Sequence, residues 1–135
     1  MADGSPPETV REFIRSFNEQ DLDAFAAVLH PEVELHSGRG PRRGVAEARE
    51  WATKKPGGAQ QTVILDGLLI PGWGNGEMAI VEITRRWVWA EDGSPAGEEE
   101  MEWLFTFAGG LVRRWRPYDR RGEIQEVWER GGRGE

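Results

Sequence analysis

The sequence predicts an α+β domain in which helices come first along the chain and an antiparallel sheet follows them. Apolar residues recur at helical spacing in most of the segment before Pro56, whereas long β-rich runs fill most of the segment after it. At 135 residues the chain fits one domain, residues 1–135, in which we expect about residues 5–130 to be ordered. Helices and strands segregated in this way place the helices on one face of the sheet.

Two helices are expected near the start of the chain. Ser5-Pro6-Pro7-Glu8 is typical of a capping box, with Ser5 on the free amides and Glu8 at the third helical position. The apolar stripe of this first helix consists of Val10, Phe13, Ile14 and Phe17. Asp21 is expected to cap a second helix. His30-Pro31 should end that helix, because the residue before a proline is pushed out of the α region.

A short strand, a loop and a third helix come next. Residues 32–36 alternate with period two and predict the strand, and residues 37–43, rich in Gly, Pro and Arg, predict an irregular loop. The third helix should begin near Gly44 and be broken by residues 56–58.

The rest of the chain is predicted to be mostly strand. The β-rich runs are residues 62–70, 78–90, 100–108 and 111–118. Gly-rich or charged turns separate them, which favours consecutive antiparallel strands. Asp119 is expected to cap a last short helix that holds Ile124, Val127 and Trp128, and residues 131–135 read as a disordered tail.

Composition excludes several classes of function. A net charge of -7 and a pI near 5.0 argue against nucleic-acid binding, which needs a cationic face. With no cysteine and two histidines, we expect no metal site, and no glycine fingerprint of a nucleotide cofactor is present. No apolar run approaches the roughly 20 residues that cross a bilayer, and the first residues lack a signal-peptide pattern. We therefore expect a cytoplasmic protein without cofactor or membrane contact.

Four segments carry a resemblance to a known family. The segment from Phe13 to Ala24 resembles the opening of SnoaL-like proteins, in which the first helix ends in Asn-x-x-Asp-Leu-Asp. Residues 30–36 resemble the first strand of that family, residues 44–51 its third helix, and residues 115–120 its last strand and exit. The resemblance covers nearly the whole chain. It implies the nuclear-transport-factor-2-like, cystatin-like fold: a cone-shaped half-barrel of curved antiparallel sheet on three N-terminal helices, with a short C-terminal helix.

The same resemblance implies a pocket between the sheet and the helices, and a homodimer through the outer face of the sheet. Aligning the chain by these segments directs a largely aromatic set of side chains into the pocket. The predicted wall consists of Phe13, Phe17, Trp51, Trp73, Ile83, Trp87, Met101, Trp103, Phe105, Arg113, Trp115 and Tyr118. We expect a small apolar or aromatic compound to be the ligand.

Three residues are candidates for chemistry in that pocket. The alignment puts Glu34 and His36 on its side of the first strand, with His36 about where ketosteroid isomerases carry their general base. Histidine changes charge near neutral pH, so His36 could move a proton while Glu34 orients it and Arg85 stabilises negative charge. Alternatively, His36 only bonds to the following loop and Arg85 only pairs with Glu34.

Several residues differ from the catalytic residues of well-known branches of the family, which argues against the reactions of those branches. Phe13 and Trp103 stand about where the steroid isomerases hold their oxyanion-binding tyrosine and protonated aspartate, so that reaction is not expected. Pro117 replaces an aspartate of the limonene-epoxide-hydrolase branch, so epoxide hydrolysis is not expected either.

Two functions from different classes stay open. The first is a cofactor-independent enzyme of the isomerase, cyclase or dehydratase type that acts on a small apolar or aromatic carbonyl compound. The second is a ligand-binding or dimerisation module of the same fold without turnover. Glu34 and His36 favour the enzyme, whereas the absence of both well-known catalytic sets favours the binding module.

Overall fold

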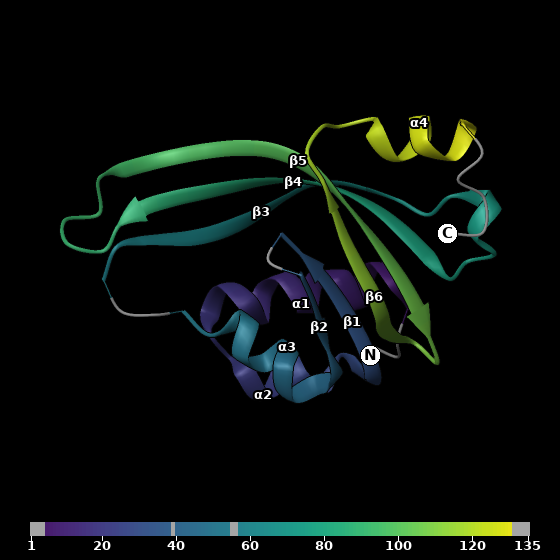
Figure 1. Cartoon of the computed structure of the whole chain (residues 1–135), viewed down its shortest axis with the longest axis horizontal. Helices are drawn as coiled ribbons and strands as arrows, with labels where there is room; N and C mark the ends of the chain where they lie inside the picture. The colour runs from purple at the N-terminus through teal and green to yellow at the C-terminus, as the bar shows by residue number, and fades with distance from the viewer. Residues whose placement is uncertain (1–4, 39, 55–56, 131–135) are drawn as a thin grey trace.

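The computed structural model describes residues 5–38, 40–54 and 57–130. One curved sheet wraps around helices α1 (Pro6–Glu19), α2 (Leu22–Ala27) and α3 (Gly44–Ala52), while a short helix, α4 (Glu123–Glu129), lies on its other side (Figure 1). The strands are β1 (Leu29–Ser37), β2 (Gly40–Arg43), β3 (Ala59–Leu69), β4 (Met78–Trp89), β5 (Pro95–Ala108) and β6 (Leu111–Tyr118), and η1 (Gly72–Gly74) is one 3₁₀ turn between β3 and β4. This arrangement confirms the predicted α+β class and curved sheet.

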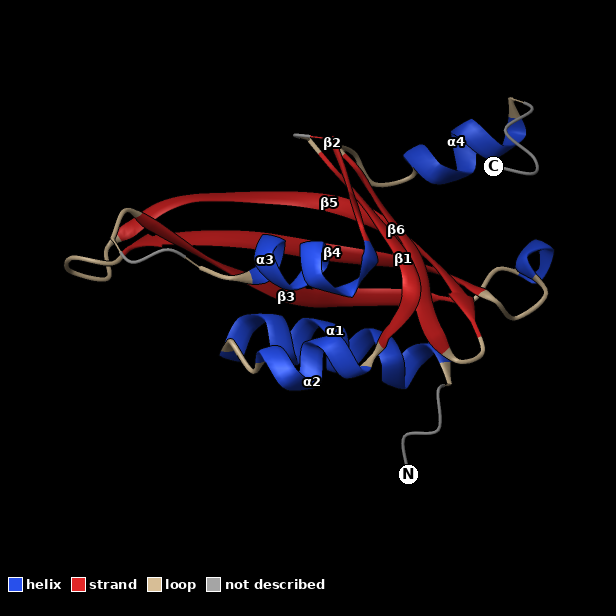
Figure 2. Cartoon of the chain, turned by 60° about the horizontal axis from the view of Figure 1, so that its bottom comes forward, coloured by secondary structure: helices blue, strands red, loops and turns tan. Residues whose placement is uncertain are grey.

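The sheet order is β2-β1-β6-β5-β4-β3. All neighbouring strands are antiparallel except β1 and β6, which run parallel and bring the first strand beside the last. Figure 2 shows β1, β2 and β6 crossing the long strands β3 to β5 steeply, with α1, α2 and α3 gathered on the enclosed side. The concave face of the sheet therefore points at the helices.

Helix α1 forms as its apolar stripe predicts, and that stripe is buried against the sheet. Its N-terminus differs from the expected capping box. The Ser5 Oγ donates a hydrogen bond to Glu8 Oε1 at 3.3 Å, and Ser5 makes no side-chain bond to a helix amide. The helix ends at Glu19, and the C-cap residue Gln20 has a φ of 57°, which lies in the left-handed region.

The prediction that His30-Pro31 ends the second helix is wrong, because α2 already ends at Ala27 and β1 begins at Leu29. Asp21 does cap α2, accepting a hydrogen bond from the Ala24 amide at 3.3 Å. Pro31 is tolerated in β1 because the register between β1 and β6 shifts between Leu29 and Glu34, where no ladder bond needs its missing N–H.

The segment predicted as an irregular loop contains strand β2, which pairs with β1 from Ser37↔Gly40 to Glu34↔Arg43. Gly40 adopts a φ of +106°, a conformation open to glycine and rare for L side chains, which permits the tight return of the chain. Strand β5 also begins earlier than expected, at Pro95 rather than Glu100.

Helix α4 is not capped by Asp119 as predicted. Its N-cap is Gly122, and the buried carboxylate of Glu102 in β5 accepts a hydrogen bond from the Ile124 amide at 3.1 Å. The predicted tail, residues 131–135, lies outside the described residues. No helix in the described part of the chain is both long and apolar enough to cross a membrane.

Buried apolar side chains in the described part of the chain form two clusters. The main core lies between the concave face and helices α1 to α3, and Phe13 of α1 meets Phe105 of β5 edge to face at 5.0 Å. The smaller cluster lies on the outer face, where Ile124 of α4 packs with Ile80 and Leu104. The main core does not fill the whole space between the sheet and the helices, and a cavity remains there.

Candidate functional site

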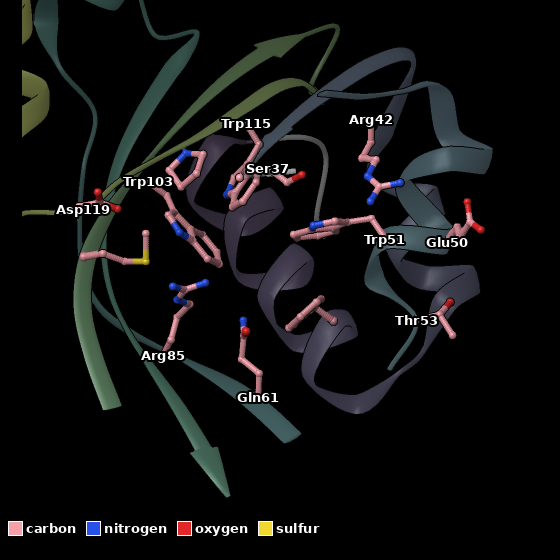
Figure 3. A pocket seen from close by; sticks show the side chains of 14 residues that line it. Ser37, Arg42, Glu50, Trp51, Thr53, Gln61, Arg85, Trp103, Trp115 and Asp119 are labelled. Carbon is pink, nitrogen blue, oxygen red and sulfur yellow. The ribbon is translucent and has the colours of Figure 1, made fainter. Parts of the chain in front are cut away.

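A cavity of about 660 Å³ opens between the concave face of the sheet and helices α1 and α3 (Figure 3). Pockets of about 300 to 1,000 Å³ are typical of small-molecule sites. The lining residues are Phe17, Ser37, Gly38, Arg42, Glu50, Trp51, Thr53, Gln61, Arg85, Met101, Trp103, Trp115, Pro117 and Asp119. They come from α1, α3 and all six strands or the segments that directly follow them, so the whole fold is needed to build this site.

Three tryptophans form most of its apolar wall. Trp103 of β5 and Trp115 of β6 project from adjacent strands and meet edge to face, with ring centroids 5.1 Å apart. Trp51 of α3 lies 5.1 Å from Trp115 and 5.6 Å from Phe17, which closes the wall on the helix side. Trp103 and Trp115 are only 3% and 4% exposed, whereas Trp51 is half-buried, so Trp51 offers the most ring surface to an aromatic ligand.

Arg85 of β4 lines the cavity, as does a second arginine, Arg42 of β2. The guanidinium of Arg85 stacks over the ring of Trp87 at 4.9 Å, and its Nη2 donates a hydrogen bond to Glu99 of β5. Glu34, the partner expected in the alternative interpretation, forms no ion pair with Arg85 in the described part of the chain. Stacking and ion pairing together fix this guanidinium at the wall.

The carboxylates of the cavity are Glu50 and Asp119, both exposed. No histidine lines the cavity in the described part of the chain. The described residues also contain no group of three or more His, Cys, Asp or Glu side chains that could hold a metal ion. Proton transfer in this cavity would therefore depend on carboxylates close to solvent.

Glu34 and His36 lie on the other face of β1, so the prediction that they face the pocket is wrong. Val33 and Leu35 are fully buried in the main core, and alternation along a strand then turns Glu34 and His36 outward. The Glu34 Oε1 lies 3.2 Å from the Nε2 of His36 and 3.6 Å from the Nε of Arg114. Their predicted catalytic roles stay untested, but neither residue lines the cavity.

The predicted wall divides into several groups. Those that line the cavity are Phe17, Trp51, Met101, Trp103 and Trp115, together with the candidate electrophile Arg85. Phe13, Ile83 and Phe105 face the same side but are buried in the main core, beyond the cavity. Trp87 is half-buried beneath Arg85 rather than on the lining.

The other three predicted wall residues lie elsewhere. Trp73 stacks on Trp128 of α4 at 4.0 Å, on the outer face. Tyr118 packs against the same outer cluster, as strand alternation next to Pro117 requires. Arg113 is turned away by an irregularity in the pairing of β5 with β6, and it donates a hydrogen bond to the Glu32 carbonyl at 2.7 Å.

Sequence reasoning missed several lining residues. Pro117 and Asp119 follow Trp115 at intervals of two, a signal that could have placed them on the same face. Arg42 was missed because β2 was taken for a loop. The sequence carries no comparable signal for Gln61 or Thr53, whose position depends on how β3 and the end of α3 meet.

Comparisons with known proteins agree with this architecture. A family model described as a SnoaL-like domain matches residues 10–115. A candidate polyketide cyclase from Xanthomonas campestris pv. campestris superposes with a TM-score of 0.69 at 17% identity, over 93% of this chain and 96% of that one. An LEH-like epoxide hydrolase of M. tuberculosis gives 0.69 at 17% identity, over 96% and 91%. RV0760c from Mycobacterium tuberculosis, in complex with estradiol-17beta-hemisuccinate, gives 0.70 at 12% identity, over 86% and 93%. No curated protein matches the sequence.

Proposed function

This chain belongs to the SnoaL-like domain family, and we propose that it binds a small apolar or aromatic compound in the cavity between its sheet and helices α1 and α3. The observation that carries this proposal is the wall of Trp51, Trp103 and Trp115 around a volume suited to a ligand of several rings. RV0760c, which shares the fold, was solved with a steroid ester and supports a ligand of that size.

We favour binding without turnover over catalysis because of the positions of the titratable groups. The cavity, as far as the structure describes it, holds no histidine, and its carboxylates, Glu50 and Asp119, are exposed. Groups close to solvent lack the buried environment that usually tunes an acid or base.

A cofactor-independent isomerase, cyclase or dehydratase is the second candidate function. It is favoured by the position of Asp119 on the lining, because a carboxylate there can exchange a proton with the edge of a bound carbonyl compound. Arg85 would then stabilise negative charge as it develops. Two structural neighbours are named as enzymes. At 17% identity they share the fold with this chain, and the likeness carries no argument about its reaction.

The test is a titration of the purified protein with anthracene-, anthraquinone- and steroid-type compounds, followed by tryptophan fluorescence and by the melting temperature. Each compound that binds is then incubated with the protein, and its mass is followed to detect conversion. We expect at least one of these skeletons to bind and to raise the melting temperature. Conversion of a bound compound would favour the second candidate function.

Trp51→Ala and Trp128→Ala form a matched pair of variants. Trp51 lines the cavity and Trp128 stacks on Trp73 on the outer face, so we expect about tenfold weaker binding only for Trp51→Ala, from a lost aromatic contact of about 1.4 kcal/mol. Equal losses in both variants, or no binding of any skeleton, would contradict the proposal.

The homodimer and the cytoplasmic location remain predictions from the sequence. The outer face of the sheet, which the resemblance assigns to the dimer, is partly covered by α4 through Ile124. Elsewhere it carries charged pairs such as Arg86–Glu98 at 2.9 Å. A dimer through this face would therefore join charged as well as apolar surfaces.

A further inference from the structure

Strand β4 carries two tryptophans beyond the cavity, on the same face of the sheet. Arg85 lines the cavity, and Trp87 and Trp89 follow it at intervals of two, so all three side chains lie on the concave face. The neighbouring strand agrees with this placement, because Gln61 of β3 also lines the cavity and lies directly opposite Trp87. The register then continues without interruption to the pair of Ala59 and Trp89. The row of side chains that begins at the cavity therefore continues to the end of β4.

Trp89 is exposed although its backbone is held in place. It is 47% exposed and belongs to neither buried cluster. Its amide donates a hydrogen bond to the Ser94 carbonyl at 2.9 Å, and its carbonyl accepts one from the Gly93 amide at 2.7 Å. Single exposed apolar residues are ordinary on protein surfaces. Trp89 differs from such residues because it continues a row that lines a cavity.

The residues beside the two tryptophans on the concave face are small. Gly97 of β5 lies opposite Trp87, Ala59 of β3 lies opposite Trp89, and both small residues are exposed. Figures 1 and 2 show this end of β3, β4 and β5 extending beyond α1, α2 and α3, so the helices do not cover it. Ala59, Trp87, Trp89 and Gly97 thus form an open strip next to the cavity, which we call the shelf.

We infer that the shelf binds a linear alkyl chain of the ligand whose ring system lies in the cavity. Trp89 is four strand residues beyond Arg85, a distance of about 13 Å. With C–C bonds of about 1.5 Å, an extended alkyl chain of about ten carbons covers this distance. Neighbouring strands are only about 4.8 Å apart, so the strip suits a single chain better than a second system of fused rings. This inference rests on the proposed function and adds a linear part to the ligand.

A second copy of the chain is the other occupant to consider for an exposed apolar strip. Two tryptophan side chains supply at most about 500 Å² of contact area, whereas each partner in a stable interface buries about 800 Å². Trp87 supplies less than this maximum because it is half-buried beneath Arg85. The shelf is therefore small for an interface between two copies but large enough for one chain of a ligand.

The probes are the N-ethyl, N-hexyl and N-decyl amides of anthracene-2-carboxylic acid, titrated against the full chain and followed by the fluorescence of the anthracene. Only the decyl chain is long enough to reach Trp89. We expect the decyl amide to bind about tenfold or more tightly than the hexyl amide, because more methylene groups are buried on the shelf. In Trp89→Ala this ratio should fall to about threefold or less, and the affinity for the ethyl amide should stay within about twofold of the wild type.

Two further variants make the test specific. Leu69→Ala is the matched control, because Leu69 is 59% exposed but lies opposite Ile80 on the outer face, and it should keep the preference for the decyl amide. Gly97→Leu retains Trp89 and fills the shelf beside Trp87. A Cβ at Gly97 would lie 3.7 Å from Cε3 of Trp87, an ordinary contact, so this variant should fold and bind the ethyl amide while losing the preference for the decyl amide. It keeps the test decisive if Trp89→Ala fails to fold.

The outcomes separate the inference from the proposed function. An unchanged decyl preference in Trp89→Ala and Gly97→Leu, or an equal loss in Leu69→Ala, would overturn the inference, and binding of the ethyl amide would still support the proposed function. Failure of all three amides would also overturn the inference, and the proposed function would fall with it only if the other ring skeletons fail too. Sedimentation velocity tests the second copy: a dimer that Trp89→Ala dissociates, with the decyl preference unchanged, would assign the shelf to that copy and overturn the inference.

Discussion

Glu34 is the centre of a small charged cluster on the outer face of β1. Its carboxylate lies 3.2 Å from His36, 3.6 Å from Arg114 and 4.0 Å from Arg43. Burial acts to raise the pKa of Glu34, but the hydrogen bond with His36 and the charge of Arg114 outweigh it and hold the pKa below its ordinary value. These groups neutralise one another on the outer face and do not contribute to the cavity.

The first prediction at this scale concerns His36→Ala. Because the imidazole lies behind the sheet from the cavity, we expect the ligand affinity to stay within about twofold of the wild type, the usual range for a surface change. Fluorescence titration checks this, with Trp51→Ala as the variant that does lose affinity. A loss for His36→Ala as large as that for Trp51→Ala would show that the outer cluster acts on the ligand.

Orientation was the hardest property of single residues to predict. The alternation of Glu32-Val33-Glu34-Leu35-His36 separates an apolar from a polar face, but it does not say which face meets the pocket. The buried Val33 and Leu35 decide this, because the pocket and the main core share one side of the sheet. Arg113 shows a related difficulty. An irregularity in strand pairing changes the face of the sheet to which a side chain points, and no feature of the sequence indicates where this irregularity lies.

At the scale of elements, two side-chain amides at the end of α1 fix this helix to the sheet and to α3. Asn18 donates to the Val63 carbonyl at 2.8 Å and accepts from the Val63 amide at 2.9 Å, as a neighbouring strand would. Gln20 donates to the Ala52 carbonyl and accepts from the Lys54 amide, each at 2.9 Å, which holds the end of α3. The family motif that begins with Asn18 therefore has a structural reason.

We predict that Asn18→Ala lowers the free energy of unfolding by about 2 kcal/mol, because two hydrogen bonds are lost and both backbone groups of Val63 lose a partner. Urea unfolding measures the change. Glu19→Ala, which removes an exposed ion-pair partner of Arg15, is the neighbouring control and should change stability by about 0.5 kcal/mol or less. Equal effects of the two variants would contradict this function of Asn18.

Most elements were predictable from the sequence, because a long segment with a clear helical or strand periodicity of apolar residues indicates its own secondary structure. The exceptions depend on pairing. Gly40-Pro41-Arg42-Arg43 has poor strand propensity and becomes β2 because β1 lies beside it, and Pro95 can begin β5 because a first strand position tolerates proline. The aromatic side of the cavity followed from the alignment with the family, which directed Met101, Trp103 and Trp115 into the pocket, but Arg42 depended on β2 and could not be predicted with it.

At the scale of the whole molecule, Arg121 joins the end of the chain to the far edge of the sheet. It forms an ion pair with Asp66 of β3 and donates a hydrogen bond to the Ile83 carbonyl of β4 at 3.0 Å. Thr84 also donates to Asp66, at 2.6 Å. The hydrogen bond from Thr84 lowers the pKa of Asp66, partial burial acts to raise it, and Arg121 lowers it further.

Acid should therefore weaken the fold partly through Asp66. In the unfolded chain its pKa is about 3.9, so the ionised form stabilises the folded state above that pH, and this contribution is lost as the pH falls through the lower pKa of the folded state. We expect Asp66→Asn to be about 1 to 2 kcal/mol less stable than the wild type at pH 7, and the difference to disappear toward pH values of about 2.

Urea unfolding between pH 7 and pH 2 measures this difference. Glu91→Gln removes an exposed carboxylate in the turn after β4 that forms no ion pair with any described residue, and it should leave the pH profile as in the wild type. A stability difference between Asp66→Asn and the wild type that stays constant over the whole pH range would contradict the linkage.

The parallel pairing of β1 with β6 has a further consequence, for the order of folding. Leu35 pairs with Trp115, so the two ends of the chain must meet before the cone closes, and contacts between such distant segments form slowly because a long loop has to be ordered first. A hairpin of β4 and β5 can form locally, but it carries only part of the wall. A ligand that recognises the closed cone therefore stabilises the chain as one cooperative unit, and it slows amide exchange in β1 and β6 together.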